Sequence, residues 1–279
     1  MTRGELVRQI QEILLQAGIT SAGFEAKELI CDSLGVSKAE LLASSFLTVS
    51  DSEEKQLFDL AKKRSQGYPL QYLLGEWEFY GRKFEVGEGV LIPRADTEVI
   101  CEEVIRYIGN RAVTVLDLCS GSGCIAITIA MECPNCQVYA IEKSQQAFGY
   151  LTRNIDLHQA SVKALLGDGL SPDSFEHIPQ FDVIVSNPPY LTQADMNALQ
   201  TEVAFEPKMA LDGGIDGLYF YRNFTALWKT HLKPSGRLFY ELGAGQEKEV
   251  SEILSQNGFY SICTTPDLCG IMRVISGSI

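Results

Sequence analysis

Two short stretches of the sequence carry residue types that could do chemistry. The first is SNPPYL at 186–191, where the apolar run FDVIV is followed by Asn187, Pro188, Pro189 and Tyr190. Proline has no N–H group and a fixed φ, so two prolines restrain the backbone carbonyls and leave them free to accept hydrogen bonds. An Asn carboxamide oxygen and such a carbonyl can hold both hydrogens of one planar NH2 group, while a Tyr ring packs on the flat group that carries it. The tetrapeptide therefore indicates chemistry at an sp² nitrogen.

The predicted chemistry is methyl transfer to that nitrogen. An sp² nitrogen is a poor nucleophile because its lone pair is delocalised. Two fixed acceptors would orient the lone pair toward an in-line methyl sulfonium and stabilise the charge that develops, so no strong general base is required at the attack step. We expect Asn187, Pro188 and Tyr190 to be catalytic and Pro189 to hold the turn. The alternative is a rigid turn with a stacking ring.

The second stretch is VLDLCSGSGCIA, which begins with another apolar run. Gly121 and Gly123 lack the side chains that would keep a ligand from the backbone, and the helix that follows presents unpaired N–H groups. The stretch also satisfies the dinucleotide pattern G-x-G-x-x-G/A, and Glu142 lies about twenty residues further on, where a ribose-binding acid belongs. The spacing fits NAD or any adenosine nucleoside cofactor.

Two aspartates narrow the choice of cofactor. Asp117 stands just ahead of the glycine loop, where a pyrophosphate would meet an additional negative charge. S-adenosylmethionine has no phosphate and carries an ammonium and a sulfonium, so an acid at this position suits it better. Asp168, in the sequence GDG, could accept a hydrogen bond from the adenine amino group or could be an ordinary turn residue beside Gly169.

The elements that must position these residues alternate between strand-like and helical. We predict strands at 112–118, 137–142, 162–167, 181–187, 236–242, 261–267 and 270–276, and helices around 122–132, 145–157, 217–231 and 246–257. This alternation predicts an α/β fold with a doubly wound, mostly parallel, seven-stranded Rossmann-like sheet and a terminal antiparallel hairpin. In such a sheet, ligands bind at the carboxyl ends of the strands, where the strand order reverses. Both chemical stretches fall at strand ends.

The N-terminal part of the chain has a different pattern. From residue 3 to about 66, apolar residues recur every three or four positions, which predicts a small helical bundle. Ser or Thr stands close ahead of Glu between the helices, as in capping boxes. The following stretch alternates around several glycines, as hairpins do. We therefore divide the chain into a helical domain at 1–74, a β-hairpin linker at 75–92 and an α/β domain at 93–279.

Composition and charge argue against several other classes of protein. No window approaches about 18 uninterrupted apolar residues, and the N-terminus is charged and amphipathic, so we expect no membrane contact and a cytoplasmic location. The eight cysteines are scattered, which suits a reducing compartment. The net charge of −13 opposes attraction to nucleic acid. Only CPNC at 133–136 has metal-like spacing, and His158, His177 and His231 are not grouped near it, so we expect no metal.

Together the two motifs resemble the class I S-adenosylmethionine-dependent methyltransferases that methylate amino groups, which include DNA adenine and protein glutamine methyltransferases. The helical domain and four further stretches resemble the PrmC/HemK family of peptide-chain release factor glutamine methyltransferases: GYPLQYLLGEWEFYGRKFEV, VLIPRADTE, EVAFEPKMALDGGIDGLYFYR and ELGAGQ. The resemblance implies N5-methylation of the glutamine in the Gly-Gly-Gln motif of bacterial class I release factors. The implied methyl donor is S-adenosylmethionine, and the helical domain and hairpin would help to dock the release factor.

The resemblance also implies which residues bind each ligand. The substrate carboxamide would be held by Asn187, Pro188, Pro189 and Tyr190. Contacts with S-adenosylmethionine would come, in addition to Asp117, from Cys119, Ser120, Gly121, Ser122, Gly123, Glu142, Asp168, Gly169 and Asn187. The chain departs from the usual family residues at four positions. It has Cys119 where the family usually has Gly and Glu142 where it usually has Asp. It has Gly169 in place of a bulky or aromatic residue and Ala95 in place of Pro. The departure at position 169 leaves open how the adenine is stacked.

Several assignments stay open. Arg94, Thr97 and Glu98 could line the cleft, or Arg94 and Glu98 could form an i,i+4 pair that opens a helix. Glu202 and Glu206 could shape the substrate entrance or could be solvated loop charges. One rival function is an N6-adenine nucleic-acid methyltransferase, which would use the same tetrapeptide on a flipped-out base. Another is a non-catalytic S-adenosylmethionine-binding module. Nothing in the sequence demands a dimer, so we expect a monomer.

Overall fold

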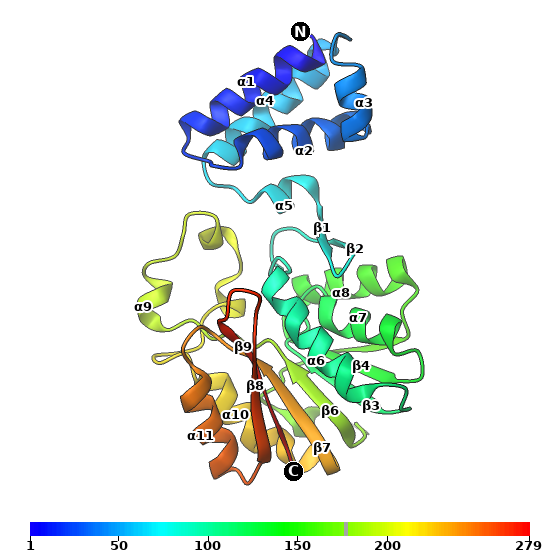
Figure 1. Ribbon diagram of the computed structural model, residues 1–279, viewed down its shortest axis with the longest axis vertical. Helices are drawn as coiled ribbons and strands as arrows, with labels where there is room; N and C mark the ends of the chain where they lie inside the picture. Colours follow the sequence, from blue (N-terminus) through cyan, green and yellow to red (C-terminus); the bar gives the residue numbers. More distant parts are fainter. Residues whose placement is uncertain (176–177) are drawn as a thin grey trace. The chain divides into compact units, whose positions relative to one another are not determined.

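The computed structural model describes residues 1–175 and 178–279, and these residues form two units (Figure 1). The first unit consists of Met1–Glu76 and Gln200–Phe205, and the second consists of Trp77–Leu199 and Glu206–Ile279. The contacts thus divide the chain at 76/77, within the stretch that we assigned to a linker. The assignment of the short segment 200–205 to the first unit was not indicated by the sequence.

The first unit is a helical bundle. Three of its helices begin with capping boxes at Thr2, Ser37 and Ser50. In each box, the Ser or Thr side chain accepts a hydrogen bond from the backbone N–H of a Glu three residues later, and the side chain of that Glu accepts from the backbone N–H of the Ser or Thr. The buried residues along the helices lie mostly three or four positions apart, as the sequence pattern predicts. The helices are α1 (Arg3–Gln16), α2 (Ala22–Leu34), α3 (Lys38–Ala43), α4 (Asp51–Ser65) and α5 (Leu70–Leu74).

A buried ion-pair network ties the segment 200–205 into the helical unit. Arg64 Nε lies 2.5 Å from Glu25 Oε2, and both side chains are almost fully buried. Arg64 Nη2 lies 2.5 Å from Glu202 Oε1. Because a buried charge is costly without a partner, removing either acid would leave part of the guanidinium uncompensated. Glu202 is therefore an ion-pair partner in the helical unit, with about half of its side chain still exposed to solvent.

A β-hairpin follows the helices, as expected. Strands β1 (Glu76–Phe79) and β2 (Arg82–Glu85) are joined by Tyr80 and Gly81, which have φ of 52° and 69°. Two successive positive φ values are typical of the tight turn whose twist matches that of the flanking strands. Asn154 holds the end of the hairpin, since its side chain accepts from Glu85 N at 2.7 Å and donates to Glu85 O at 3.0 Å.

The second unit is built on a seven-stranded sheet in the order β5-β4-β3-β6-β7-β9-β8 (Figure 1). The first five strands in this order pair in parallel, and β9 is antiparallel to both β7 and β8. This confirms the predicted mostly parallel sheet with a terminal antiparallel hairpin. The strands are β3 (Thr114–Leu118), β4 (Gln137–Glu142), β5 (Val162–Leu166), β6 (Phe181–Ser186), β7 (Leu232–Glu241), β8 (Tyr260–Pro266) and β9 (Met272–Ser278).

Helices cover both faces of this sheet. Alternate strand residues point to opposite sides, so Val115 packs with α6 (Glu98–Ile108), α7 (Cys124–Glu132) and α8 (Gln145–His158). Leu116 instead packs with α10 (Tyr219–Trp228) and α11 (Glu247–Gln256). A short helix, α9 (Gln193–Met196), lies outside these two layers (Figure 1). The strand order reverses between β4, β3 and β6, which places the carboxyl ends of β3 and β6 at the expected ligand position.

The structure differs from the predicted elements in three places. The helix α6 was missed, although its buried residues Ile100, Cys101, Val104 and Ile108 have helical spacing. Strand β7 begins at Leu232, four residues before the predicted start, because its first part contains Pro234 and Gly236, which are rare in strands. Strand β9 is shifted by two residues toward the C-terminus of the predicted run.

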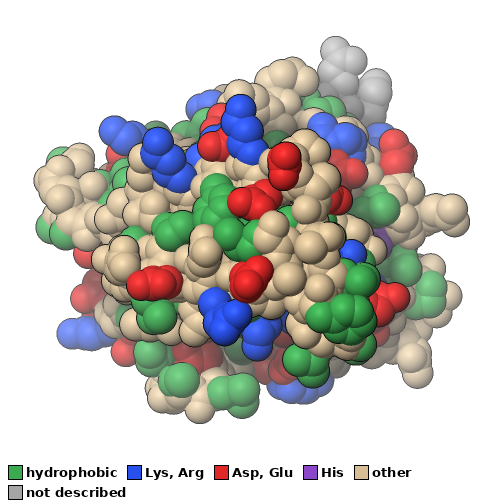
Figure 2. Space-filling view, turned by 90° about the horizontal axis from the view of Figure 1, so that it is seen from above, with side chains coloured by type: hydrophobic (Ala, Val, Ile, Leu, Met, Phe, Trp, Pro, Cys, Tyr) green, Lys and Arg blue, Asp and Glu red, His purple; other side chains and the backbone are tan. Residues whose placement is uncertain are grey.

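The surface carries charges of both signs. On the face drawn in Figure 2, Lys and Arg side chains are interspersed with Asp and Glu side chains, and that face has no broad basic area. Among residues 1–175 and 178–279, no helix is long and apolar enough to cross a membrane.

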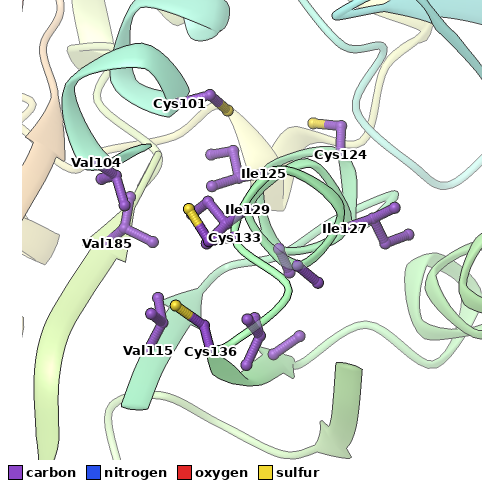
Figure 3. Close-up of a cluster of buried hydrophobic side chains, with 14 of the residues drawn as sticks. Cys101, Val104, Val115, Cys124, Ile125, Ile127, Ile129, Cys133, Cys136 and Val185 are labelled. Carbon is purple, nitrogen blue, oxygen red and sulfur yellow. The ribbon is translucent and has the colours of Figure 1, made fainter. Parts of the chain in front are cut away.

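The cysteines that drew attention in the sequence are packing residues. Figure 3 shows Cys101, Cys124, Cys133 and Cys136 among valine and isoleucine side chains of one buried cluster. All are free thiols, and burial raises the pKa of Cys133 to about 11, so the thiol stays protonated at neutral pH. The described residues contain no group of three side chains placed to hold a metal ion. His177 lies outside the described residues.

Candidate active site

A cavity of about 290 Å³ opens at the carboxyl ends of β3, β4 and β6, and all the residues that line it belong to the second unit. Nine of the predicted site residues line it: Cys119, Ser120, Gly121, Ser122, Glu142, Asp168, Gly169, Asn187 and Pro189. The predicted residues that do not line it are Asp117, Gly123, Pro188 and Tyr190. The structure thus brings the glycine loop and the Asn-Pro-Pro-Tyr tetrapeptide to one cavity.

The glycine loop between β3 and α7 turns by repeated left-handed backbone conformations. Cys119, Gly121 and Gly123 have φ of 62°, 55° and 84°, a region that only Gly adopts at no steric cost. Cys119 therefore accepts the strain that the usual family Gly would avoid. A Cβ on Gly123 would lie 2.5 Å from Leu151 Cδ1, so this glycine serves close packing of the loop on α8 and does not face the ligand.

Glu142, at the end of β4, holds the loop in this shape. Its two carboxylate oxygens accept from Gly121 N at 2.8 Å and from Ser144 N at 2.6 Å. Burial raises the pKa of this carboxyl, and the backbone hydrogen bonds oppose that shift. Each oxygen keeps a further lone pair, and the side chain lines the cavity, so Glu142 can also accept from the hydroxyls of a ribose.

Asp117 occupies a different environment from the one we expected. Its side chain is fully buried at the end of β3 and does not line the cavity, and the Ser120 side chain and the Ala126 N–H beside the carboxyl offset only part of the effect of burial on its pKa. Burial raises its pKa to about 8. The structure therefore gives no support to a direct contact with the cofactor, and it places this acid behind the loop.

The end of the cavity where we expect the adenine is formed around Gly169. Asp168 Oδ2 pairs with Lys143 Nζ at 2.7 Å, and its Oδ1 accepts from Leu170 N at 2.9 Å. A Cβ on Gly169 would lie 3.3 Å from the Phe224 ring, and Phe224 and Phe220 both line the cavity. The two rings lie 5.4 Å apart and come from α10. Sequence reasoning missed these rings, although both lie in or next to the quoted stretch GLYFYR.

The tetrapeptide after β6 is held from several sides. Asn187 is half-buried, and its Nδ2 donates to Thr97 Oγ1 at 3.3 Å. Pro188 and Pro189 are buried, and only Pro189 lines the cavity. Tyr190 O accepts from Gln246 Nε2 at 3.1 Å, and burial raises the pKa of the Tyr190 phenol. The predicted contact of this ring with the substrate stays a prediction.

The charged residues before and after the tetrapeptide have partners that the sequence did not reveal. Arg94 lines the cavity and forms an ion pair with Glu206, which is buried and also accepts from Ile92 N at 3.0 Å. Glu98 accepts from Tyr80 N at 2.8 Å. The i,i+4 pair of Arg94 with Glu98 is therefore wrong, and Glu206 is a buried structural acid rather than a solvated loop charge.

The cavity fits an adenosine nucleoside with a positively charged sulfur. It offers an acidic acceptor in Glu142, aromatic rings in Phe220 and Phe224, and loop backbone without side chains at Gly121. Among the described residues, the glycine loop itself carries no lysine or arginine, although a pyrophosphate bound there would need a positive counter-charge. The cationic side chains that line the cavity are Arg94 and Lys143, and each is paired with an acid. These features favour S-adenosylmethionine over a dinucleotide.

Comparison with known proteins agrees with this assignment. Family models for the PrmC N-terminal domain and the methyltransferase small domain match residues 5–75 and 97–214. The release factor glutamine methyltransferase of Geobacter sulfurreducens is 41% identical over 95% of this chain and 93% of its own. That of Thermodesulfovibrio yellowstonii is 40% identical over 90% of each chain.

A solved structure shows the same fold at low identity. A methyltransferase from Pyrococcus furiosus superposes with a TM-score of 0.53 and 16% identity, covering 82% of this chain and 98% of that one. The identity is too low to speak for function, so this likeness concerns the fold alone. The curated relatives decide the family, because they are at least 40% identical over nine tenths of the chain. This chain belongs to the family of release factor glutamine methyltransferases.

Proposed function

We propose that this protein methylates the side-chain amide nitrogen (N5) of the glutamine in the Gly-Gly-Gln motif of bacterial class I release factors. The observation that carries the proposal is that Asn187 and Pro189 share one cavity with the glycine loop and Glu142. The substrate comes from the relatives, which are named release factor glutamine methyltransferases. The cavity supports the chemistry and the family supports the substrate.

S-adenosylmethionine supplies a methyl group on a sulfonium, which leaves as the neutral thioether of S-adenosylhomocysteine. Glu142 would accept from the ribose hydroxyls, and Asp168 would accept from the adenine amino group. Loop residues 119–122 would face the nucleoside with their backbone. Phe220 and Phe224 would supply the apolar faces that Gly169 cannot. Glu142 and the loop together fix where the methyl group is presented.

The tetrapeptide would hold the acceptor. Asn187 Oδ1 and the Pro188 carbonyl would each accept one hydrogen of the glutamine NH2, which directs its lone pair at the methyl group. As the nitrogen becomes positively charged, both acceptors stabilise that charge more than they stabilise the neutral amide. Methyl transfer would leave a positively charged N-methylated amide nitrogen, which then loses one proton to give the neutral N-methyl amide. Water is a sufficient acceptor because an amide that is cationic at nitrogen is strongly acidic. Tyr190 would pack on the flat carboxamide.

Other parts of the proposal concern partners and location. We propose that the helical unit helps to dock the release factor, and it exposes large apolar side chains at Phe24, Leu42 and Phe46. Since the substrate acts in translation, the proposed compartment is the cytoplasm. The net charge of −13 disfavours nucleic acid as a direct partner. We propose a monomer.

Labelled S-adenosylmethionine tests the function directly. The purified protein is incubated with a class I release factor, with the same release factor carrying Gln→Ala in its Gly-Gly-Gln motif, and with adenine-containing DNA and RNA. We expect label only in the unchanged release factor. Equal labelling of both release factors, or labelling of nucleic acid, would overturn the proposal. Cofactor binding without any transfer would instead favour a non-catalytic module.

A further inference from the structure

Two side chains lie behind the Asn187 carboxamide. Asn187 Nδ2 donates to Thr97 Oγ1 at 3.3 Å, and Thr97 is almost fully buried at the start of α6. Because Asn187 also lines the cavity, its carboxamide has one side toward the ligand and one toward the protein interior. The interior side decides which end of the amide, oxygen or NH2, faces the substrate.

The second side chain is Glu241, the last residue of β7. The register pairs Ser186 with Tyr240, so the next residues on these neighbouring parallel strands, Asn187 and Glu241, lie side by side. Glu241 is 2% exposed, and its Oε2 has no hydrogen-bond partner among the described residues. Burial raises the pKa of Glu241 to about 7, while hydrogen bonds from Thr97 and Asn187 and the charge of Arg273 act in the opposite direction.

The chemistry of these groups favours one arrangement of donors. In its ionised form, Glu241 can only accept hydrogen bonds, and the groups beside it that can donate are Thr97 Oγ1 and Asn187 Nδ2. The lone pairs of that hydroxyl are then available to Asn187 Nδ2, which agrees with the observed contact. A flipped carboxamide would present its oxygen to the ionised acid, which has no proton to offer. With Glu241 ionised, the interior side of Asn187 therefore favours the NH2 group.

We infer that Thr97 and Glu241 are positioning residues that fix the Asn187 carboxamide with its NH2 toward the interior and its oxygen toward the substrate amide. This inference rests on the proposed function, in which that oxygen accepts from the glutamine. It gives a further role to Thr97 of VLIPRADTE, which also lines the cavity, and a role to Glu241, which begins ELGAGQ and does not line it. In this inference both residues act through Asn187.

Single-turnover methyl transfer to the release factor tests the inference by double mutants. Thr97→Val keeps the shape of the side chain and removes the hydroxyl, and Thr97→Ser keeps the hydroxyl. We expect Thr97→Val to slow transfer by about 10- to 100-fold, with Thr97→Ser within about threefold of the unchanged protein. In an Asn187→Ala background, Thr97→Val should add less than about twofold, because residues that act as one unit are not additive. Glu241→Gln, which can offer an NH2, should behave as Thr97→Val does.

Two controls separate positioning from a structural effect. Thr97→Val should stay cooperatively folded, with its melting temperature lowered only by the few degrees that one lost buried hydrogen bond costs. Its affinity for S-adenosylmethionine should stay within about threefold. Transfer at the normal rate by folded Thr97→Val, or a full additional loss in the Asn187→Ala background, would overturn the inference. If Thr97→Val does not fold, the same comparison is made with Glu241→Gln.

An NMR measurement tests the orientation without any turnover. The side-chain NH2 signals of Asn187, assigned by their loss in Asn187→Ala, should be protected from solvent exchange in the unchanged protein. Thr97→Val should remove that protection, and Thr97→Ser should restore it. Unprotected Asn187 signals in the unchanged protein would overturn the inference. If the protein fails to methylate release factors, the proposed function falls, whereas this measurement still decides how the carboxamide is held.

Discussion

The glycine loop after β3 and the Asn-Pro-Pro-Tyr tetrapeptide after β6 follow neighbouring parallel strands, yet they are held by different kinds of contact. In the loop, the groups that we expect to face the ligand are mainly backbone, and Glu142 holds the loop through the N–H of Gly121, 21 residues away. In the tetrapeptide, the decisive group is the side chain of Asn187. Its partner Thr97 lies 90 residues away in the sequence, and Glu241 comes from yet another strand.

This difference concerns what each region has to do. A loop that binds a cofactor needs a fixed backbone and little else, so local glycines and one acid suffice. An acceptor that must point its oxygen at a reacting nitrogen needs its amide orientation fixed, and that requires side chains from outside the motif. Substitutions in the loop should therefore affect cofactor affinity, and substitutions around the tetrapeptide should affect the rate of transfer.

The largest expected effect is on the rate, from Asn187→Ala. Removing one of two acceptors that gain strength in the transition state should slow single-turnover transfer by about 10²- to 10³-fold. The affinity for S-adenosylmethionine should fall far less than the rate, because the loop and Glu142 are untouched and Asn187 would be only one of several cofactor contacts. The measurement is rapid-quench transfer of labelled methyl, with cofactor binding by calorimetry. Asn110→Ala, an exposed position next to α6 and outside the cavity lining, is the matched control.

The opposite pattern should follow from Glu142→Ala. The substitution leaves Gly121 N and Ser144 N without their acceptor and removes the acid at the ribose position, so affinity for S-adenosylmethionine should fall by about 10- to 100-fold. At saturating cofactor, the single-turnover rate should recover to within a few-fold. Glu142→Asp, the usual family residue, should bind nearly as tightly as the unchanged protein, and exposed Glu249→Ala is the control. A rate defect that persists at saturation would contradict the proposed separation of roles.

The same contrast explains what the sequence could predict. The strands β3, β4 and β6 are short apolar runs that end at turn signals, so their positions were predicted to within two residues. The glycine loop was found because its function depends on local backbone freedom. The roles of Glu241 and Phe220 were missed because each depends on an element brought beside the motif only by the sheet order. Thr97 was noticed as a polar residue near the cleft, without its partner.

The charged residues teach the same lesson. From the sequence, Arg94 and Glu98 satisfied the helical i,i+4 spacing, which is a local criterion. In the structure, Arg94 pairs with Glu206, 112 residues away, and Glu98 caps the hairpin backbone at Tyr80. Asp117 was assigned to the cofactor because its position ahead of the loop is close in sequence. Its burial depends on which way the last residues of β3 point, which only the packed sheet determines.

A smaller effect, on stability, should come from Asp117→Asn. Burial raises the folded-state pKa of Asp117 from 3.8 to about 8, so ionisation opposes folding. The contribution of the protonated acid is fully present below its unfolded pKa and is lost as pH rises through about 8. Asn cannot ionise, so the free energy of unfolding of the variant relative to the unchanged protein should rise by about 3 to 4 kcal/mol between pH 5 and pH 8.

Urea unfolding at pH 5, 6.5 and 8 measures this difference. Taking the difference between the two proteins cancels the other titrating groups, including Glu241. If the free energies of unfolding of the two proteins change with pH in parallel, then Asp117 has the same pKa in the folded and the unfolded protein. The raised pKa that we assign to its burial behind the loop would then be wrong.

The smallest expected effect concerns the adenine end of the loop, where this chain departs from its family at Gly169. The Phe224 ring lies against Gly169, and Phe220 also lines the cavity. We propose that these aromatic faces from α10 take the place of a bulky residue at position 169. Phe220→Leu keeps an apolar side chain and loses the flat face, which should weaken adenosine binding by about three- to tenfold. The affinity of the Phe220→Leu protein for methionine, measured by competition, should not change. As a second control, Phe46→Leu in the helical unit should leave the affinity for adenosine unchanged. Equal weakening of adenosine and methionine would mean that the substitution disturbs the whole cavity, and the aromatic compensation for Gly169 would then be wrong.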